Sequence, residues 1–162
     1  MKKEEILTKV NYDLPKAKAI HQWLNEGTQG AEAQPTQVVS PFIDGNGKKW
    51  VHICAGKFDF LFDINDLTNK ELNFEDANKL AEKNGMYLSP KHEWELIEAF
   101  REDVDAVIEE LGGTPLHDWY WAGSEYSGSS AWLFFATYGR LYNGLKMGSY
   151  GVRASLAFDK HL

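Results

Sequence analysis

The sequence predicts an α+β fold: strands come first, two helices follow, and the C-terminal half is irregular and rich in aromatic residues. Three observations support this prediction. Residues 38–64 show the alternation of strands, and residues 74–111 contain two stretches with helical periodicity. After Pro115 the helical periodicity ends, and aromatic and glycine residues dominate the chain.

The strand region is predicted as three segments, at residues 38–39, 50–53 and 58–62. Residues 44–47 read Asp-Gly-Asn-Gly, a composition typical of the tight turn of a β-hairpin. These strands are therefore expected to begin a sheet.

The first helix is predicted over residues 74–84. Asn73 is a suitable N-cap, because its side chain can accept a hydrogen bond from the first turn. Gly85 stands where a left-handed C-terminal cap is expected.

The second helix is predicted over residues 90–111 as one continuous element. Ser89 is expected to cap it, and Pro90 suits its first turn. One stripe of side chains runs along its whole length and comprises Trp94, Ile97, Arg101, Val104, Ile108 and Leu111.

The 162 residues suit one folded domain preceded by an arm. Residues 1–26 are predicted to be helical, and residues 27–35 have the glycine and proline content of a linker. We therefore expect a helical arm and linker over residues 1–36 and a folded domain over residues 37–162.

Charge and hydropathy exclude several partners. The formal net charge is −7, and no cluster of Lys and Arg offers the positive surface that nucleic acid requires. No apolar run approaches the roughly 18 residues of a membrane span, and the first residues lack the pattern of a secretory signal. We expect a soluble protein that is cytoplasmic as synthesised.

The sequence contains no catalytic or metal-binding motif. Cys54 is the single cysteine, and its apolar neighbours indicate an inert, buried thiol. The five histidines lack metal-ligand spacing, and Leu96 stands where a zinc-protease helix starting at His92 needs a second histidine. No serine has the flanking glycines of a nucleophile elbow. The carboxylates and amides are interpreted as solvated turn or helix residues, namely Asp59, Asp63, Asn65, Asp66, Glu93, Glu95 and Glu98.

The segment after Pro115 has a distinctive composition. Residues 117–158 include eleven aromatic residues and only five charged ones, and about half of residues 120–151 are Tyr, Ser, Gly or Asn. This combination is typical of recognition loops, in which rigid rings stand beside small hydrogen-bonding residues. It also suits a strand-rich core with many turns, so both interpretations remain open on composition alone.

Two parts of the chain resemble a known family. Residues 120–127 (Tyr-Trp-Ala-Gly-Ser-Glu-Tyr-Ser), 131–132 (Ala-Trp) and 150–153 (Tyr-Gly-Val-Arg) are similar to the closing segment of C-type-lectin-like variable proteins, the targets of diversity-generating retroelements in bacteria and phages. Residues 87–94 resemble a helix start found in the formylglycine-generating-enzyme branch of the same fold. The resemblance covers about residues 40–158. Ala122 and Ala154 depart from it, since the family usually has serine and proline there.

The resemblance implies a C-type-lectin-like binding domain over residues 37–162, with two helices packed on a small, twisted, mostly antiparallel sheet. Its structural positions fall on Trp94, Trp121, Trp132, Phe134, Val152 and Arg153. Its variable, ligand-contacting positions fall on Tyr126, Ser127, Ser129, Ser130, Leu133, Phe135, Thr137, Tyr138, Arg140, Tyr142, Asn143, Leu145 and Met147.

Strand alternation adds a prediction about exposure. If Trp132 and Phe134 point into the core, Leu133 and Phe135 point outward. They are then expected on one exposed face together with Tyr126, Tyr138, Arg140 and Tyr142. Arg153, as a structural residue, is expected to be buried and bonded to carbonyl groups or a carboxylate.

The implied function is non-catalytic binding of a protein or carbohydrate ligand, without a cofactor or a metal. Two alternatives stay open. An oxidase related to the formylglycine-generating enzyme would need a cysteine pair or a metal-bound thiolate, whereas Cys54 has no partner. A structural domain would use the same surface to associate with a copy of itself. The resemblance is also compatible with a place on a virion.

Overall fold

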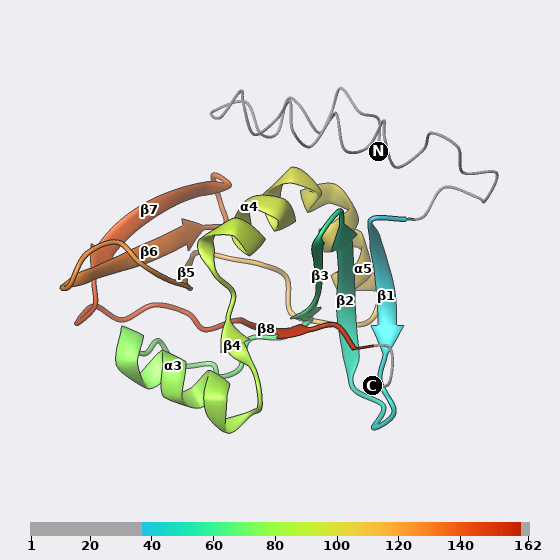
Figure 1. The fold of residues 1–162 in the computed structure, drawn as a ribbon, viewed down its shortest axis with the longest axis horizontal. Helices are drawn as coiled ribbons and strands as arrows, with labels where there is room; N and C mark the ends of the chain where they lie inside the picture. Colours follow the sequence, from blue (N-terminus) through green and yellow to red (C-terminus); the bar gives the residue numbers. More distant parts are fainter. Residues whose placement is uncertain (1–36, 160–162) are drawn as a thin grey trace.

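A computed structural model describes residues 37–159, which form two antiparallel sheets and three helices (Figure 1). The predicted α+β class is confirmed. The arm predicted over residues 1–36 lies outside the described residues, as do residues 160–162.

The larger sheet has five strands in the order β1-β2-β3-β8-β4. β1 (Val39–Ile43), β2 (Lys49–Ala55) and β3 (Phe58–Asp63) are joined as successive antiparallel hairpins. β8 (Ala154–Ala157) comes from the far end of the described chain and inserts between β3 and β4 (Tyr87–Leu88). The two ends of the described chain, residues 39–63 and 154–157, therefore belong to the same sheet.

The turn between β1 and β2 forms at the predicted residues 44–47. Asp44 Oδ1 accepts hydrogen bonds from the amides of Asn46 and Lys48 at 2.8 and 3.0 Å. Gly47 has a φ of 82°, which residues with a Cβ rarely adopt. The predicted hairpin is confirmed, and its strands extend beyond the predicted segments.

α3 (Phe74–Lys83) confirms the first predicted helix. The Asn73 side chain caps it by accepting a hydrogen bond from the Asp76 amide at 2.8 Å. Gly85 follows with a φ of 72°, as expected for a left-handed residue after a helix.

The second predicted helix consists of two helices, α4 (Lys91–Ala99) and α5 (Arg101–Glu110), which are separated at Phe100. The prediction of one continuous helix is wrong because its two halves pack on different sheets. α4 contacts the smaller sheet, whereas α5 contacts β1 and β2. The buried Phe100 lies at the corner between them.

The start of α4 also differs from the prediction. Ser89 does not cap the helix, because its hydroxyl is buried and hydrogen bonded to the Ser155 hydroxyl at 2.7 Å. Pro90 occupies the N-cap position, and the Lys91 amide instead donates to Ser124 Oγ at 2.9 Å. Ser124 lies on β5, so the smaller sheet itself holds the helix start.

The smaller sheet contains β5 (Trp119–Glu125), β6 (Ser130–Phe135) and β7 (Arg140–Leu145), in that order. The prediction of irregular structure is wrong for residues 119–145, which form three strands joined by short loops, with a register shift in β5 between Trp121 and Glu125. Residues 146–153, between β7 and β8, contain only isolated bridges. Residues 115–159 contain no helix, which confirms that part of the prediction.

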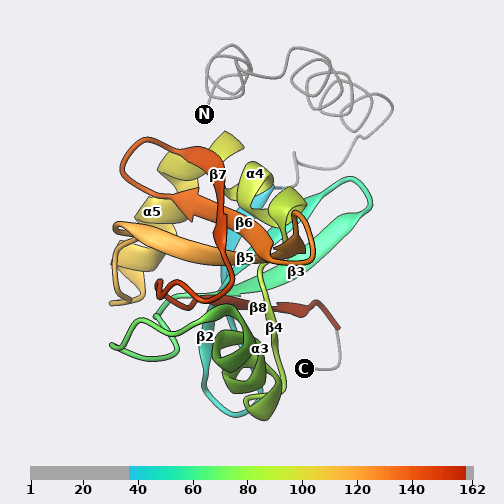
Figure 2. The same ribbon diagram turned by 90° about the vertical axis from the view of Figure 1, so that its left-hand side faces the viewer.

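Each face of the smaller sheet is covered in part by a helix, and Figure 2 shows α3 and α4 on opposite sides of β5. On one side Trp94 of α4 stacks on Phe134, with ring centroids 4.6 Å apart and planes 12° from parallel. On the other side Phe74 of α3 meets Trp121 edge-on at 5.3 Å. Trp94 and Trp121 are fully buried and belong to two separate apolar core clusters.

Candidate functional site

The smaller sheet presents its side chains in rows that cross the three strands. One row consists of register partners at the end of the sheet away from α3, namely Trp119, Phe135 and Arg140. The next row on the same face consists of Trp121, Leu133 and Tyr142. The two rows differ in burial: Trp121 and Leu133 are buried, whereas Trp119 and Phe135 are half-buried.

Leu133 is buried, so the expectation that it is exposed is wrong. Only 2% of its surface is exposed, and it packs in the second core cluster with Trp121. Gly144 on β7 leaves room for it, because a Cβ there would lie 2.6 Å from Leu133 Cδ1. Alternation along β6 correctly predicts which side chains share a face, but it does not predict that α3 covers this part of the face.

Four exposed or half-buried rings on this side of the sheet form what we call the aromatic face: Trp119, Phe135, Tyr138 and Tyr142. The Trp119 ring lies 4.3 Å from the Phe135 ring and 5.2 Å from the Tyr142 ring, and Phe135 lies 5.1 Å from Tyr138. Tyr138 is 71% exposed and Tyr142 37%, whereas Trp119 and Phe135 are half-buried. The inner rings therefore support the outer ones by edge and tilted packing.

Trp119 was not among the predicted contact residues. The closing segment that carries the resemblance begins at Tyr120 and so does not include it. The signal that could have identified it is the alternation of Trp119 with Trp121 along β5, which places both rings on one face.

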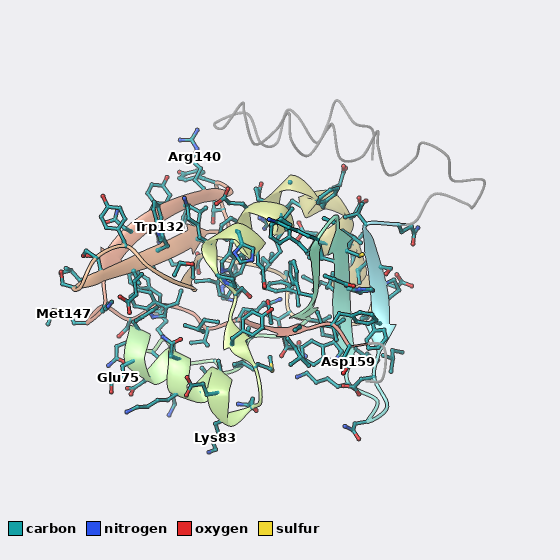
Figure 3. All side chains as sticks on the ribbon, viewed as in Figure 1. Glu75, Lys83, Trp132, Arg140, Met147 and Asp159 are labelled. Carbon is teal, nitrogen blue, oxygen red and sulfur yellow. The ribbon has the colours of Figure 1, made fainter. Side chains whose placement is uncertain are left out.

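Arg140 lies beside the aromatic face at the first position of β7 and projects away from the ribbon (Figure 3). It is the register partner of Phe135, so the two side chains share a face. Within residues 37–159 its guanidinium has neither a hydrogen bond nor an ion pair. Arg140 therefore offers a free positive charge next to the exposed rings.

Tyr126 and Trp132 lie on the opposite face of the sheet, so the expectation that Tyr126 shares a face with Phe135 is wrong. Their rings meet edge-on at 5.2 Å, and Lys91 Nζ lies 4.4 Å from the Trp132 ring centroid. Trp132 is half-buried at the margin of the first core cluster and not inside it. The reason is that α4 begins at Lys91, so this end of the face is covered by one lysine side chain and no helix backbone.

The other predicted contact residues lie at loops and at the end of β7. Ser127 Oγ accepts a hydrogen bond from the Ser130 amide at 3.2 Å, so these two residues shape the loop between β5 and β6. Ser130 is half-buried. The exposed residues are Ser127, Ser129, Thr137, Asn143, Leu145 and Met147.

Arg153 is fully buried and makes the bonds expected of it. It pairs with the Asp66 carboxylate at 2.6 Å and donates to the carbonyls of Thr114 and Asp63 at 2.7 and 3.4 Å. The interpretation of these acids as solvated is wrong: Asp63 is 3% exposed, and Asp66 also accepts from the Tyr120 hydroxyl at 2.9 Å. Burial raises the pKa of Tyr120 to about 12, which keeps this hydroxyl a donor.

Glu93 is likewise buried, at 4% exposure, and does not lie on a wet helix face. Burial raises its pKa to about 7, although hydrogen bonds from Ser155 and Tyr87 oppose the shift. The Tyr87 hydroxyl donates to Oε2 at 2.8 Å, and Oε1 has no hydrogen-bond partner among the described residues. The enclosed carboxyl faces the interior between α4, β4 and β8, away from the aromatic face.

Two features bear on possible chemistry in the described residues: the thiol of Cys54 and the distribution of metal-ligating side chains. Cys54 is half-buried, and burial together with nearby Asp59 raises the pKa of its thiol, which disfavours the nucleophilic thiolate. Within residues 37–159, no three His, Cys, Asp or Glu side chains gather as metal ligands would. The helices of that part of the chain are all too short or too polar to cross a membrane.

Comparison with known proteins adds no relative. No protein-family model matches the chain, and no curated protein matches it.

Proposed function

We propose that this protein is a non-catalytic recognition protein of the C-type-lectin-like variable type, and that the aromatic face and Arg140 contact its ligand. The observation that supports this most strongly is the exposure of Tyr138 and Tyr142 on the outside of a sheet whose core is already filled by Trp94 and Trp121. These rings contribute little to the core, and exposed apolar groups gathered in one place mark interaction sites.

The packing of α3 and α4 on a small antiparallel sheet supports the proposed fold, and the exposure of β7 and its flanking loops supports a ligand surface there. Tyrosine and arginine are both enriched at binding hot spots. A protein or a carbohydrate ligand would use the same groups.

The oxidase alternative has less support. It requires a reactive thiolate, and the burial of Cys54 acts against ionisation. Self-association of the aromatic face is the remaining alternative. Sedimentation of the wild-type chain, which measures its oligomeric state, separates self-association from ligand binding.

The experiment compares the wild-type chain with the double variant Tyr138→Ser/Tyr142→Ser on peptide and glycan arrays. We expect the variant to lose the binding of the wild-type chain while its melting temperature stays nearly unchanged, since interface anchors contribute about 2 kcal/mol or more each. Ile43→Ser is the matched control, because Ile43 is also exposed, at 57%, but lies on the larger sheet. Equal binding by all three proteins would contradict the proposal.

A further inference from the structure

β7 is an edge strand. It pairs with β6 on one side and with no other strand of residues 37–159 on the other. Figure 1 shows it as the outermost strand of the smaller sheet. An edge strand carries a row of unpaired N–H and C=O groups, which can pair with another chain.

The register identifies the backbone groups at this free edge. The Lys146 amide donates to the Ser129 carbonyl at 2.9 Å, and bonded pairs alternate with non-bonded pairs along an antiparallel ladder. Every second residue of β7 therefore bonds to β6, namely Arg140, Tyr142 and Gly144. The residues between them direct their N–H and C=O groups outward, namely Leu141, Asn143 and Leu145. The Leu145 carbonyl already accepts a hydrogen bond from the Gly148 amide at 2.9 Å, so the open edge comprises the groups of Leu141 and Asn143 and the Leu145 amide.

β7 has few of the features by which proteins prevent strand pairing. Its six residues include no proline, and its one charged residue is Arg140 at the first position. An open edge of this kind suits strand addition, in which the backbone of an extended peptide supplies affinity and its alternate side chains supply specificity.

The charged side chains around β7 indicate which kind of peptide would bind at its free edge. Residues 126–158 contain no acidic residue, although the whole chain has a net charge of −7. Of the three basic residues in that segment, Lys146 pairs with Glu125 at 3.3 Å and Arg153 with Asp66 at 2.6 Å. Arg140 has no such partner among residues 37–159. The Glu98 carboxylate lies next to Gly139 and pairs with Arg101 at 3.0 Å. An acidic partner therefore complements this edge through Arg140.

A second copy of the chain fits the edge less well. Antiparallel pairing of two β7 strands centred on Asn143 would place Arg140 of one copy opposite Lys146 of the other. Like charges directly opposite each other destabilise a strand pair. In that register the charge pattern favours an acidic peptide over self-association.

We propose that the free edge of β7 binds an extended peptide with acidic side chains, which joins the smaller sheet as a fourth strand. This inference rests on the proposed recognition function and specifies its ligand class. The side chains of the peptide alternate between the aromatic face, beside Tyr142 and Arg140, and the opposite face, beside Leu145.

The test uses the isotope-labelled full chain and three capped peptides of six residues, the length of β7, in which valine alternates with glutamate, lysine or threonine. We expect saturable binding of the glutamate peptide, with NMR shifts centred on the amides of Leu141, Asn143 and Leu145. The lysine peptide should bind at least about tenfold more weakly. A titration in which the glutamate peptide leaves these three amides unchanged overturns the proposal.

Two further measurements isolate the backbone pairing. Asn143→Pro removes one outward amide at a position where an edge strand tolerates proline, and Asn143→Thr keeps that amide as the matched control. We expect at least about tenfold weaker binding by the proline variant and little change in the threonine variant. With the wild-type chain, a glutamate peptide methylated on every amide nitrogen should not bind, and full affinity of the methylated peptide contradicts strand addition.

The outcome also separates this inference from the proposed function. Binding that depends on Tyr138 and Tyr142 but is insensitive to Asn143→Pro and to peptide methylation leaves the recognition surface intact and excludes the edge. Binding that depends on Asn143→Pro and not on the two tyrosines supports the edge and contradicts the role of the aromatic face.

Discussion

Arg153 donates two hydrogen bonds to one oxygen of Asp66, from Nη2 at 2.6 Å and from Nε at 2.9 Å. Its Nη2 also donates to the carbonyl of Thr114 at 2.7 Å. A fully buried cation thus joins three segments: the chain before β8, the loop after β3 and the turn before β5.

Replacement of Arg153 by alanine is expected to lower the free energy of unfolding by about 2–4 kcal/mol, because Asp66 and the Thr114 carbonyl lose their donors in the interior. Chemical denaturation measures this loss. Lys79→Ala is the control, since the pair of Lys79 with Glu75 is exposed to solvent and should contribute little to stability. Equal stability of the Arg153 variant and the control would show that the buried pairing adds nothing to the fold.

Glu93 should make stability depend on pH. Its pKa is about 7 in the folded protein against an ordinary value of 4.5, so the folded state holds the proton more tightly than the unfolded state. The free energy of unfolding therefore falls as the pH rises from 4.5 to about 7, and the loss is complete above that range.

The variant Glu93→Gln stays neutral at every pH and keeps an acceptor for the Tyr87 hydroxyl. We expect it to be more stable than the wild-type chain above pH 7 by about 2–3 kcal/mol and nearly equal to it at about pH 4.5. Urea denaturation across this range is the measurement. Parallel stability curves for the two proteins would mean that Glu93 does not titrate in this window.

Leu133 and Tyr138 should respond in opposite ways to truncation. Leu133→Ala creates a cavity beside Trp121 and is expected to cost about 2–5 kcal/mol of stability. Tyr138→Ala removes an exposed ring and should stay within about 0.5 kcal/mol of the wild-type chain. Thermal melting compares the two variants, and a large loss in Tyr138→Ala would place that ring in the core.

The elements with strong local signals could be predicted from the sequence. Asn73 and Gly85 mark the ends of α3 by their own chemistry, and residues 44–47 form a turn because aspartate and glycine suit it. The break at Phe100 could not be predicted, because the apolar stripe continues through it without interruption. Only the packing of α4 and α5 on different sheets requires the break.

In the candidate site, too, features set by local sequence could be predicted and features set by tertiary packing could not. Alternation along β6 predicts that Leu133 and Phe135 share a face, and they do. It cannot predict that α3 covers Leu133 and leaves Phe135 half-exposed, since that depends on a helix distant in sequence. The charge environment of Glu93 was missed for the same reason: its partner Ser155 lies on β8.

The position of β8 has a consequence for how the chain can fold during synthesis. Ser89, next to β4, and Ser155 on β8 are 66 residues apart, and β8 separates β4 from β3 in the larger sheet. On the ribosome, β1, β2 and β3 must wait with an open edge until residues 154–157 emerge, because β4 has no strand to pair with before then. Long-range pairing of this kind slows folding. The three strands of the smaller sheet are neighbours in sequence, so they can pair with one another before the larger sheet is complete.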